Sequence, residues 1–199
     1  RSGIAVTGRI EESPQLLEDA RGYRELAFWE SDLPSTLAAC NQPSQNFYAE
    51  MLFRTLGWKL KGKGTQENAR EAVAEFLKEA GVEAASQIDG SGLSRENRAA
   101  PADLVKLLLF MRGRPDAKTF FDSLPAGGDK KGTLRSRFLA ADLRDRIRAK
   151  TGHISGVAAL SGTIESAGGD TFLFSILVNA PPGSGMGGDG SQVCEMAPH

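Results

Sequence analysis

The chain has 199 residues, of which 40% are hydrophobic and 25% are charged, and its formal net charge at pH 7 is −1. This composition is typical of a globular domain with a buried core, and the charge does not favour binding to nucleic acid. The two cysteines, Cys40 and Cys194, are too few for a disulfide scaffold. The two histidines, His153 and His199, are too far apart to predict a zinc site. We therefore expect no metal and no nucleic-acid partner.

The first part of the chain contains two strand-like segments: 3–10, in which apolar residues alternate with small or polar ones, and 25–31. After the second segment, Ser35 is expected to cap a short helix over 36–40, because a serine side chain can accept a hydrogen bond from a free backbone N–H there. A polar turn, 41–46, then leads into a longer helix.

This longer helix is predicted to bury one apolar face and to end at Gly57. The apolar residues that recur at helical spacing are Phe47, Tyr48, Met51, Leu52 and Leu56. Another helix is expected from about Thr65 to Ala80, with Gly81 as its stop.

A loop rich in glycine and serine follows at 86–95, and Pro101 suits the first turn of a helix that continues to Met111. A short helix is expected around Phe120 and Phe121. The segment beyond it contains a loop rich in glycine and lysine, 127–133.

The last ordered part is predicted to be a β-hairpin, with strands at 157–164 and 171–178 around a glycine turn. Residues 181–199 are rich in proline and glycine and are expected to form a flexible tail. Strands and helices in this order predict an α/β (α+β) fold in which helices pack on a mostly antiparallel sheet.

Lys150-Thr151-Gly152 places a cation, a hydroxyl and a small residue directly before a β-prone segment. A substrate that ends in a carboxylate would be bound by such a cation and hydroxyl, and a glycine allows close approach to the strand. The alternative is an edge strand that begins with a solvated lysine.

Two polar segments are further candidates for the site. Ser44 and Asn46 stand where a helix begins, so they either cap that helix or carry out chemistry, the serine by relaying a proton and the asparagine by orienting substrate and a lysine. The segment 89–94, Asp-Gly-Ser-Gly-Leu-Ser, reads as an ordinary turn or as part of the same site.

The order of these motifs carries a family resemblance. Ser44-x-Asn46, then 89–94, then the segment 132–138 and finally Lys150-Thr151-Gly152 resemble the C-terminal part of one group of low-molecular-mass penicillin-binding proteins. This group is the D-alanyl-D-alanine carboxypeptidase/endopeptidase family. Lys-Thr-Gly is the third active-site element of penicillin-binding proteins and serine β-lactamases. The resemblance covers about residues 26–180.

The resemblance implies a β-lactamase/transpeptidase-like fold, of which residues 1–180 are the C-terminal part. It also implies a serine-type D-Ala-D-Ala carboxypeptidase or endopeptidase that acts on peptidoglycan stem peptides and is acylated by β-lactams. No cofactor is expected. The location implied is the periplasm or the outer face of the bacterial cytoplasmic membrane, because the substrate lies there.

The resemblance assigns roles residue by residue. Ser44 would transfer a proton to the leaving amine, Asn46 would hold the substrate amide and the motif lysine, and Lys150 would bind the terminal carboxylate. The expected substrate-binding residues are Thr151, Gly152, Ser91, Arg95 and Ser155.

One motif of the family is absent. No serine or threonine in the chain is followed three residues later by lysine, although the family's nucleophile lies in a Ser-x-x-Lys motif near the N-terminus. The nucleophile is therefore expected upstream, in the same polypeptide or in a companion N-terminal segment. The chain is then a piece of an enzyme, one part of a processed enzyme or a non-catalytic peptidoglycan- or β-lactam-binding module. A serine β-lactamase is a further alternative.

Overall fold

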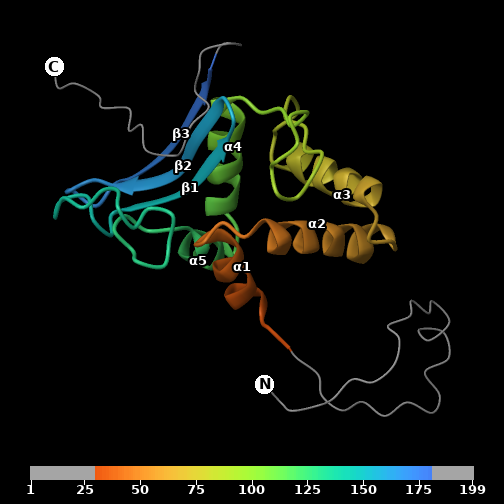
Figure 1. Cartoon of the computed structure of the whole chain (residues 1–199), viewed down its shortest axis with the longest axis horizontal. Helices are drawn as coiled ribbons and strands as arrows, with labels where there is room; N and C mark the ends of the chain where they lie inside the picture. The colour runs from red at the N-terminus through yellow and green to blue at the C-terminus, as the bar shows by residue number, and fades with distance from the viewer. Residues whose placement is uncertain (1–29, 181–199) are drawn as a thin grey trace. The chain divides into compact units, whose positions relative to one another are not determined.

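The computed structural model describes residues 30–180. The description below concerns the compact unit that begins at Asp32. Its helices and strands in chain order are α1 (Leu33–Asn41), α2 (Asn46–Lys61), α3 (Gln66–Glu79), α4 (Pro101–Arg112), α5 (Ala117–Ser123), β1 (Ile147–Ile154), β2 (Val157–Glu165) and β3 (Thr171–Asn179). Figure 1 shows their arrangement.

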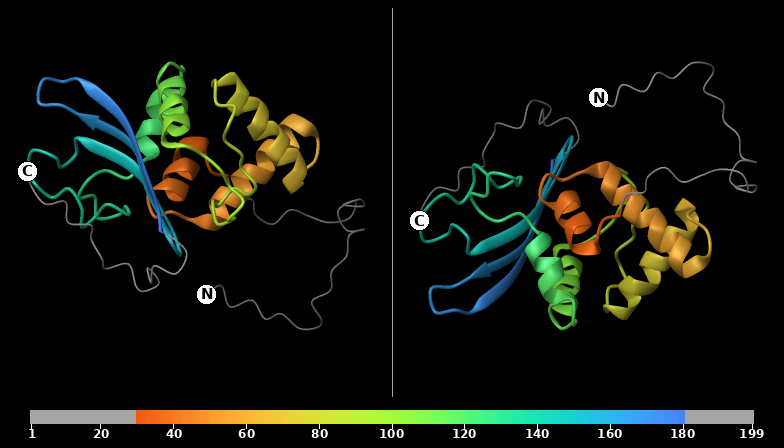
Figure 2. Two further views of the ribbon diagram at one scale, coloured as in Figure 1. Left: turned by 90° about the horizontal axis from the view of Figure 1, so that it is seen from above. Right: turned by 90° about the horizontal axis from the view of Figure 1, so that it is seen from below.

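The three strands form one antiparallel sheet in the order β1-β2-β3. Helix α4 lies along one face of the sheet and contacts β3 and β2, while α2 packs against α3 and α1 contacts both α5 and α2 (Figures 1 and 2). The predicted hairpin and the predicted packing of helices on an antiparallel sheet are confirmed, and Lys150-Thr151-Gly152, expected directly before a strand, lies inside β1. The expected strand at 3–10 and most of the one at 25–31 lie outside the described residues.

The prediction for the start of α1 was wrong. The helix begins at Leu33, and its cap is Asp32, whose side chain accepts a hydrogen bond from the backbone N–H of Ser35 at 2.7 Å. The carboxylate lies three residues before the expected cap, and besides accepting this hydrogen bond it interacts favourably with the positive end of the helix dipole.

The predicted end of α2 was also wrong, since Gly57 lies inside the helix. A Cβ atom at Gly57 would lie 2.7 Å from the backbone nitrogen of Ala69, so the missing side chain lets α2 and α3 approach closely. The helix continues to Lys61, and Gly62, with a φ of 81°, provides its left-handed cap. Glycine spacing within a sequence does not distinguish a helix stop from a close helix contact.

The apolar face predicted for α2 is not buried by the described residues. Four of its members are exposed: Phe47 at 69%, Tyr48 at 43%, Met51 at 41% and Leu56 at 45%. The buried positions are instead Gly57, which faces α3, and Phe53, which lies against Gly90 in the loop at 89–97. Helix α2 therefore has apolar residues on more than one side, and α3 covers only the side that carries Gly57.

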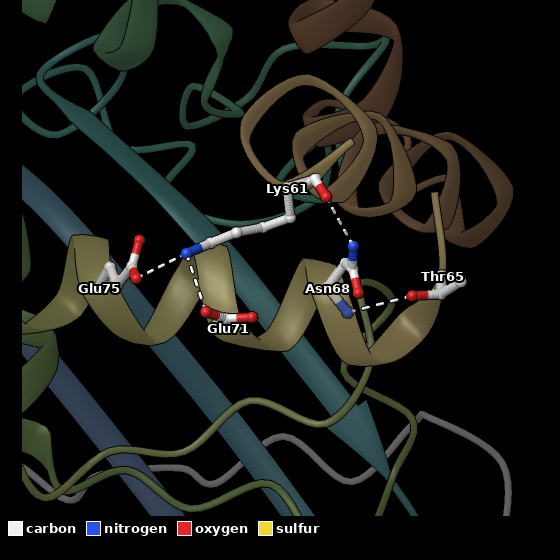
Figure 3. A network of polar contacts seen from close by, with 5 residues as sticks. All are labelled: Lys61, Thr65, Asn68, Glu71 and Glu75. Carbon is white, nitrogen blue, oxygen red and sulfur yellow. Dashed lines mark hydrogen bonds and ion pairs between the residues drawn. The ribbon is translucent and has the colours of Figure 1, made fainter. Parts of the chain in front are cut away.

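Polar contacts close the turn between α2 and α3 (Figure 3). The Lys61 amine donates hydrogen bonds to Glu71 at 3.0 Å and Glu75 at 2.6 Å, and these acceptors raise its pKa. The Asn68 side chain donates to the Lys61 carbonyl, and Thr65 caps α3 by accepting from the Asn68 N–H. The expected helices from Thr65 and from Pro101 are confirmed, and Gly81 has a φ of 72° just beyond α3.

The segment between α5 and β1 supports the strand that carries Lys150. Residues 123–128 are buried, and Leu134 is 0% exposed. Ala126 forms a β-bridge with Arg148, and the backbone N–H of Ala149 donates to the carbonyl of Pro125 at 3.0 Å. The start of β1 is therefore fixed from both sides, by this segment and by β2.

Candidate active site

The structure brings Ser44 and Lys150 together although they are 106 residues apart in sequence. The Lys150 amine donates a hydrogen bond to the Ser44 hydroxyl at 2.7 Å and another to the carbonyl of Thr151 at 2.9 Å. Ser44 has a φ of 58°, a conformation that costs energy in a residue with a side chain. The cap position of α2 belongs to Gln45, so Ser44 points at the lysine and does not cap the helix.

The surroundings of Lys150 make its amine release a proton more readily than an exposed lysine does. Burial lowers the pKa of its amine, and the buried Cys40 thiol nearby contributes a smaller opposing effect. Burial also raises the pKa of Cys40, which is 7% exposed. A lysine whose proton is held less tightly than usual, with a serine hydroxyl as hydrogen-bond partner, can both bind an anion and exchange a proton with that serine.

Thr151 joins the same cluster through a residue that the motif analysis did not assign to the site. Its hydroxyl donates to the Thr133 hydroxyl at 3.0 Å, and the Thr133 N–H donates to the carbonyl of Gln42 at 3.0 Å. Thr133 thus links the strand to the turn before Ser44. Thr133 belongs to the segment 132–138, which was part of the family resemblance. That membership was the one sequence signal that pointed to Thr133.

Asn46 is the first residue of α2 and is exposed. Its side chain makes no hydrogen bond to any of the described residues, whereas Ser44 two positions earlier is engaged by Lys150. The structure therefore places Asn46 beside the Ser44–Lys150 pair without showing what its amide holds.

The loop at 89–97 is ordered by one carboxylate. Asp89 accepts hydrogen bonds from Asn97 at 2.8 Å, from the N–H groups of Ser94 at 2.7 Å and Gly92 at 3.0 Å, and from the Ser91 hydroxyl at 3.3 Å. Burial by itself raises the pKa of Asp89, but these hydrogen bonds outweigh it and leave the pKa below its ordinary value of 3.8. These hydrogen bonds hold the loop in one conformation, so it is more than an ordinary turn.

We expect Asp89→Asn to destabilise the chain by about 1–2 kcal/mol at neutral pH, because hydrogen bonds to a charged acceptor are lost. The lowered pKa of Asp89 means that its stabilisation is present above pH 3.8 and is lost as the pH falls through the folded-state value. Denaturant unfolding at neutral pH and near pH 3 measures both effects. The exposed Asp142→Asn is the control, and an Asp89→Asn variant with the control's pH dependence would contradict the assignment.

The same loop is held against α2. The Ser91 N–H donates to the Glu50 carboxylate at 2.9 Å, and a Cβ atom at Gly90 would lie 2.5 Å from the carbonyl oxygen of Ala49. Glu50 and Gly90 therefore position the loop; sequence reasoning included Gly90 only as a member of the segment 89–94 and gave neither residue a role. Only the three-dimensional contact reveals them, because they lie on different elements.

Arg95 connects the loop to the sheet. Its guanidinium donates to the carbonyl of Ser155 in the β1–β2 turn at 3.0 Å. Between loop and sheet lies a cleft of about 620 Å³, a size that fits a small-molecule or peptide ligand. Its polar lining includes Ser91, Arg95 and Asn97, and its apolar lining includes Leu104, Ile154 and Leu177.

The predicted residues therefore form two neighbouring groups. Ser44, Lys150 and Thr151 meet in a polar cluster, whereas Ser91, Arg95 and Gly152 line the cleft. Lys150 and Gly152 lie two residues apart on β1 and so on one face of the sheet, which makes the strand the link between the groups. Ser155 contributes its backbone carbonyl.

Within residues 30–180, no three His, Cys, Asp or Glu side chains gather in a group that could hold a metal ion. No helix in this part of the chain combines the length and apolarity that a bilayer span requires.

Comparison with known proteins agrees with the family resemblance of the sequence. A model of the D-Ala-D-Ala carboxypeptidase 3 (S13) family matches residues 1–191. The D-alanyl-D-alanine carboxypeptidase of Actinomadura sp. (strain R39) is 36% identical over 159 residues, which is 77% of this chain. The D-alanyl-D-alanine carboxypeptidase DacB of Haemophilus influenzae is 30% identical over 152 residues, or 74% of the chain. The chain belongs to the D-Ala-D-Ala carboxypeptidase 3 (S13) family.

Solved structures show the same architecture. Penicillin-binding protein 4 (dacB) from Haemophilus influenzae superposes with a TM-score of 0.69 at 28% identity, over 74% of this chain and 34% of that one. The same protein complexed with a β-lactam gives a TM-score of 0.67. The expected transpeptidase-like fold, present as a partial domain, is confirmed. The chain spans 29% of the length of the Actinomadura relative and 32% of the Haemophilus one.

Proposed function

We propose that this chain supplies the substrate-anchoring part of a serine-type D-Ala-D-Ala carboxypeptidase or endopeptidase that acts on peptidoglycan stem peptides and is acylated by β-lactams. The observation that carries the proposal is the 2.7 Å hydrogen bond from Lys150 to Ser44, which joins two of the family's motifs at one point. Family membership and the cleft beside the pair support it.

Each residue has a role that its geometry permits. Lys150, with Thr151, binds the terminal carboxylate of the substrate, because a half-buried ammonium is a strong anchor for an anion. Ser44 passes a proton through its hydrogen bond with Lys150 toward the leaving amine. Asn46 holds the substrate amide and the motif lysine.

The cleft takes the rest of the stem peptide. The backbone beyond Gly152 runs along an edge of the sheet, where an extended peptide can add as a further strand. Arg95, Ser91 and Ser155 stand around the cleft and its rim and contact the peptide there.

The nucleophile comes from a Ser-x-x-Lys segment that is absent from these 199 residues. We place this segment in the N-terminal remainder of the same polypeptide or in a companion chain. The enzyme works in the periplasm or at the outer face of the bacterial cytoplasmic membrane, where peptidoglycan is accessible. Acylation and deacylation would then occur on the serine of that segment.

Intact-mass spectrometry with benzylpenicillin tests the proposal. The chain alone should gain no adduct, whereas a chimera in which the full chain replaces the matched region of the Actinomadura relative should gain one penicilloyl group, outside the 199 residues. An adduct on a residue of this chain would show that its motifs have been assigned wrongly.

Two other activities remain as outcomes of this experiment. The absence of Ser-x-x-Lys favours a non-catalytic peptidoglycan- or β-lactam-binding module, and a chimera that binds penicillin without an adduct would establish it. Repeated hydrolysis of nitrocefin by the chimera would indicate a serine β-lactamase. A carboxypeptidase would instead release the acyl group derived from the β-lactam slowly.

A further inference from the structure

The hydroxyl of Thr133 is a polar group beside the candidate site to which the proposed function gives no role. Thr133 is half-buried and lies in the segment between α5 and β1, 18 residues before Thr151. Its hydroxyl accepts a hydrogen bond from the Thr151 hydroxyl at 3.0 Å. Within residues 30–180 the Thr133 hydroxyl makes this hydrogen bond and no other. The side chain of Thr133 therefore faces a residue assigned to carboxylate binding.

The backbone around Thr133 is held on both sides. Its N–H donates to the carbonyl of Gln42 at 3.0 Å. The next residue, Leu134, is 0% exposed, and a Cβ atom at Gly132, the residue before, would lie 3.0 Å from the Cβ of Pro125. A side chain whose neighbours are fixed by packing is held in place before a ligand arrives. The Thr133 hydroxyl is therefore preorganised next to β1.

Two hydroxyls that share one hydrogen bond have a proton left over. Each hydroxyl has one donor proton and two acceptor lone pairs. When Thr151 donates to Thr133, as in this structure, the Thr151 proton is not available to a ligand. When the hydrogen bond reverses and Thr133 donates, the Thr151 proton is free to point at an anion. A hydroxyl that accepts a hydrogen bond is also a better donor, because hydrogen bonds in a chain polarise one another.

We propose that Thr133 is a positioning residue for recognition of the substrate carboxylate. When the substrate binds, the Thr133 hydroxyl donates to the Thr151 oxygen and so directs the Thr151 proton at the terminal carboxylate. Thr133 acts through Thr151 and does not touch the carboxylate itself. The proposal rests on the proposed function, which places the carboxylate at Lys150 and Thr151, and it adds the residue that orients one of these two anchors.

The preference of the chimera for a carboxylate over an ester tests this role. Benzylpenicillin has a free carboxylate, whereas its methyl ester has the same β-lactam ring without that negative charge. Thr133→Val removes the hydroxyl but keeps the shape of the side chain and the N–H that binds Gln42. Thr133→Ala is a second variant without the hydroxyl, in case valine prevents folding, and Thr133→Ser retains the hydroxyl. Thr171→Val on β3 is the control.

The measurement is the rate of acylation by each compound, followed by intact mass. We expect Thr133→Val and Thr133→Ala to slow acylation by benzylpenicillin roughly five- to thirty-fold, the effect of one lost hydrogen bond near a charge. Acylation by the methyl ester should be unchanged, so the preference for the acid falls by the same factor. Thr133→Ser and the Thr171→Val control should retain the preference.

Equal slowing with the acid and the ester would overturn the proposal, because it would show that Thr133 only shapes the surrounding structure. A Thr133→Ser variant that has lost the preference for the acid would also overturn it, since its hydroxyl is still present.

A chimera that gains no adduct from either compound would remove the proposed function. The proposal about Thr133 is then decided by titration calorimetry of the same two compounds with the same variants. Tighter binding of the acid than of the ester, present with threonine or serine and lost with valine, would support it. The absence of this preference in the unsubstituted chimera, or an undiminished preference with valine, would overturn it.

Discussion

Replacing Lys150 with alanine is expected to slow penicillin acylation of the chimera by roughly thirty-fold to several thousand-fold. The estimate follows from the cost of removing one partner of a buried charge interaction, about 2–5 kcal/mol. The substrate carboxylate loses its cation, and the Ser44 hydroxyl loses the amine that holds it at 2.7 Å. The rate of penicilloyl formation by intact mass is the measurement. Acylation at the unchanged rate would reject the role of Lys150.

Lys118→Ala is the matched control, since this lysine is 88% exposed on α5 and should leave the rate unchanged. Thermal unfolding separates a chemical loss from a folding defect. Burial lowers the pKa of Lys150, so the folded chain holds this proton less tightly than the unfolded chain and gains stability as the pH rises toward the ordinary lysine value of 10.5. The Lys150→Ala variant should still unfold cooperatively, but its stability should lack the increase with rising pH that Lys150 gives.

Gly162→Val is expected to destabilise the chain by about 3 kcal/mol or more, because the buried centre of the sheet has no room for a side chain. A Cβ atom at Gly162 would lie 2.1 Å from the carbonyl oxygen of Arg148 and 2.6 Å from the Cα of Ala149. Strand β1 would have to move away from β2, and Lys150 would move with it. Denaturant unfolding measures the loss.

The control for this variant is Ala158→Val, an exposed position on the same strand. A β-branched residue suits an exposed strand position, so we expect a change within about 0.5 kcal/mol. Equal stability of the two variants would show that the sheet adapts to a side chain at Gly162.

The sequence by itself determined much of the fold and the identity of the site motifs. Pro101 and Gly81 bound helices as predicted, and the two strands around Gly169 pair as expected, because these signals depend on backbone geometry within a few residues. The order of Ser44, the 89–94 loop and Lys150 also indicated the family, since short motifs keep their residue types for chemical reasons.

Only the tertiary structure decided how each residue is used. From the sequence, Gly57 could be a helix stop and Ser44 a helix cap. In the structure, Gly57 allows close packing against Ala69 of α3, and Ser44 accepts a hydrogen bond from Lys150. The apolar residues of α2 were identified correctly, yet burial depends on what packs against a helix, and α3 covers only its other side. Periodicity reports that a face is apolar, whereas the partner that covers it is a property of the assembled fold.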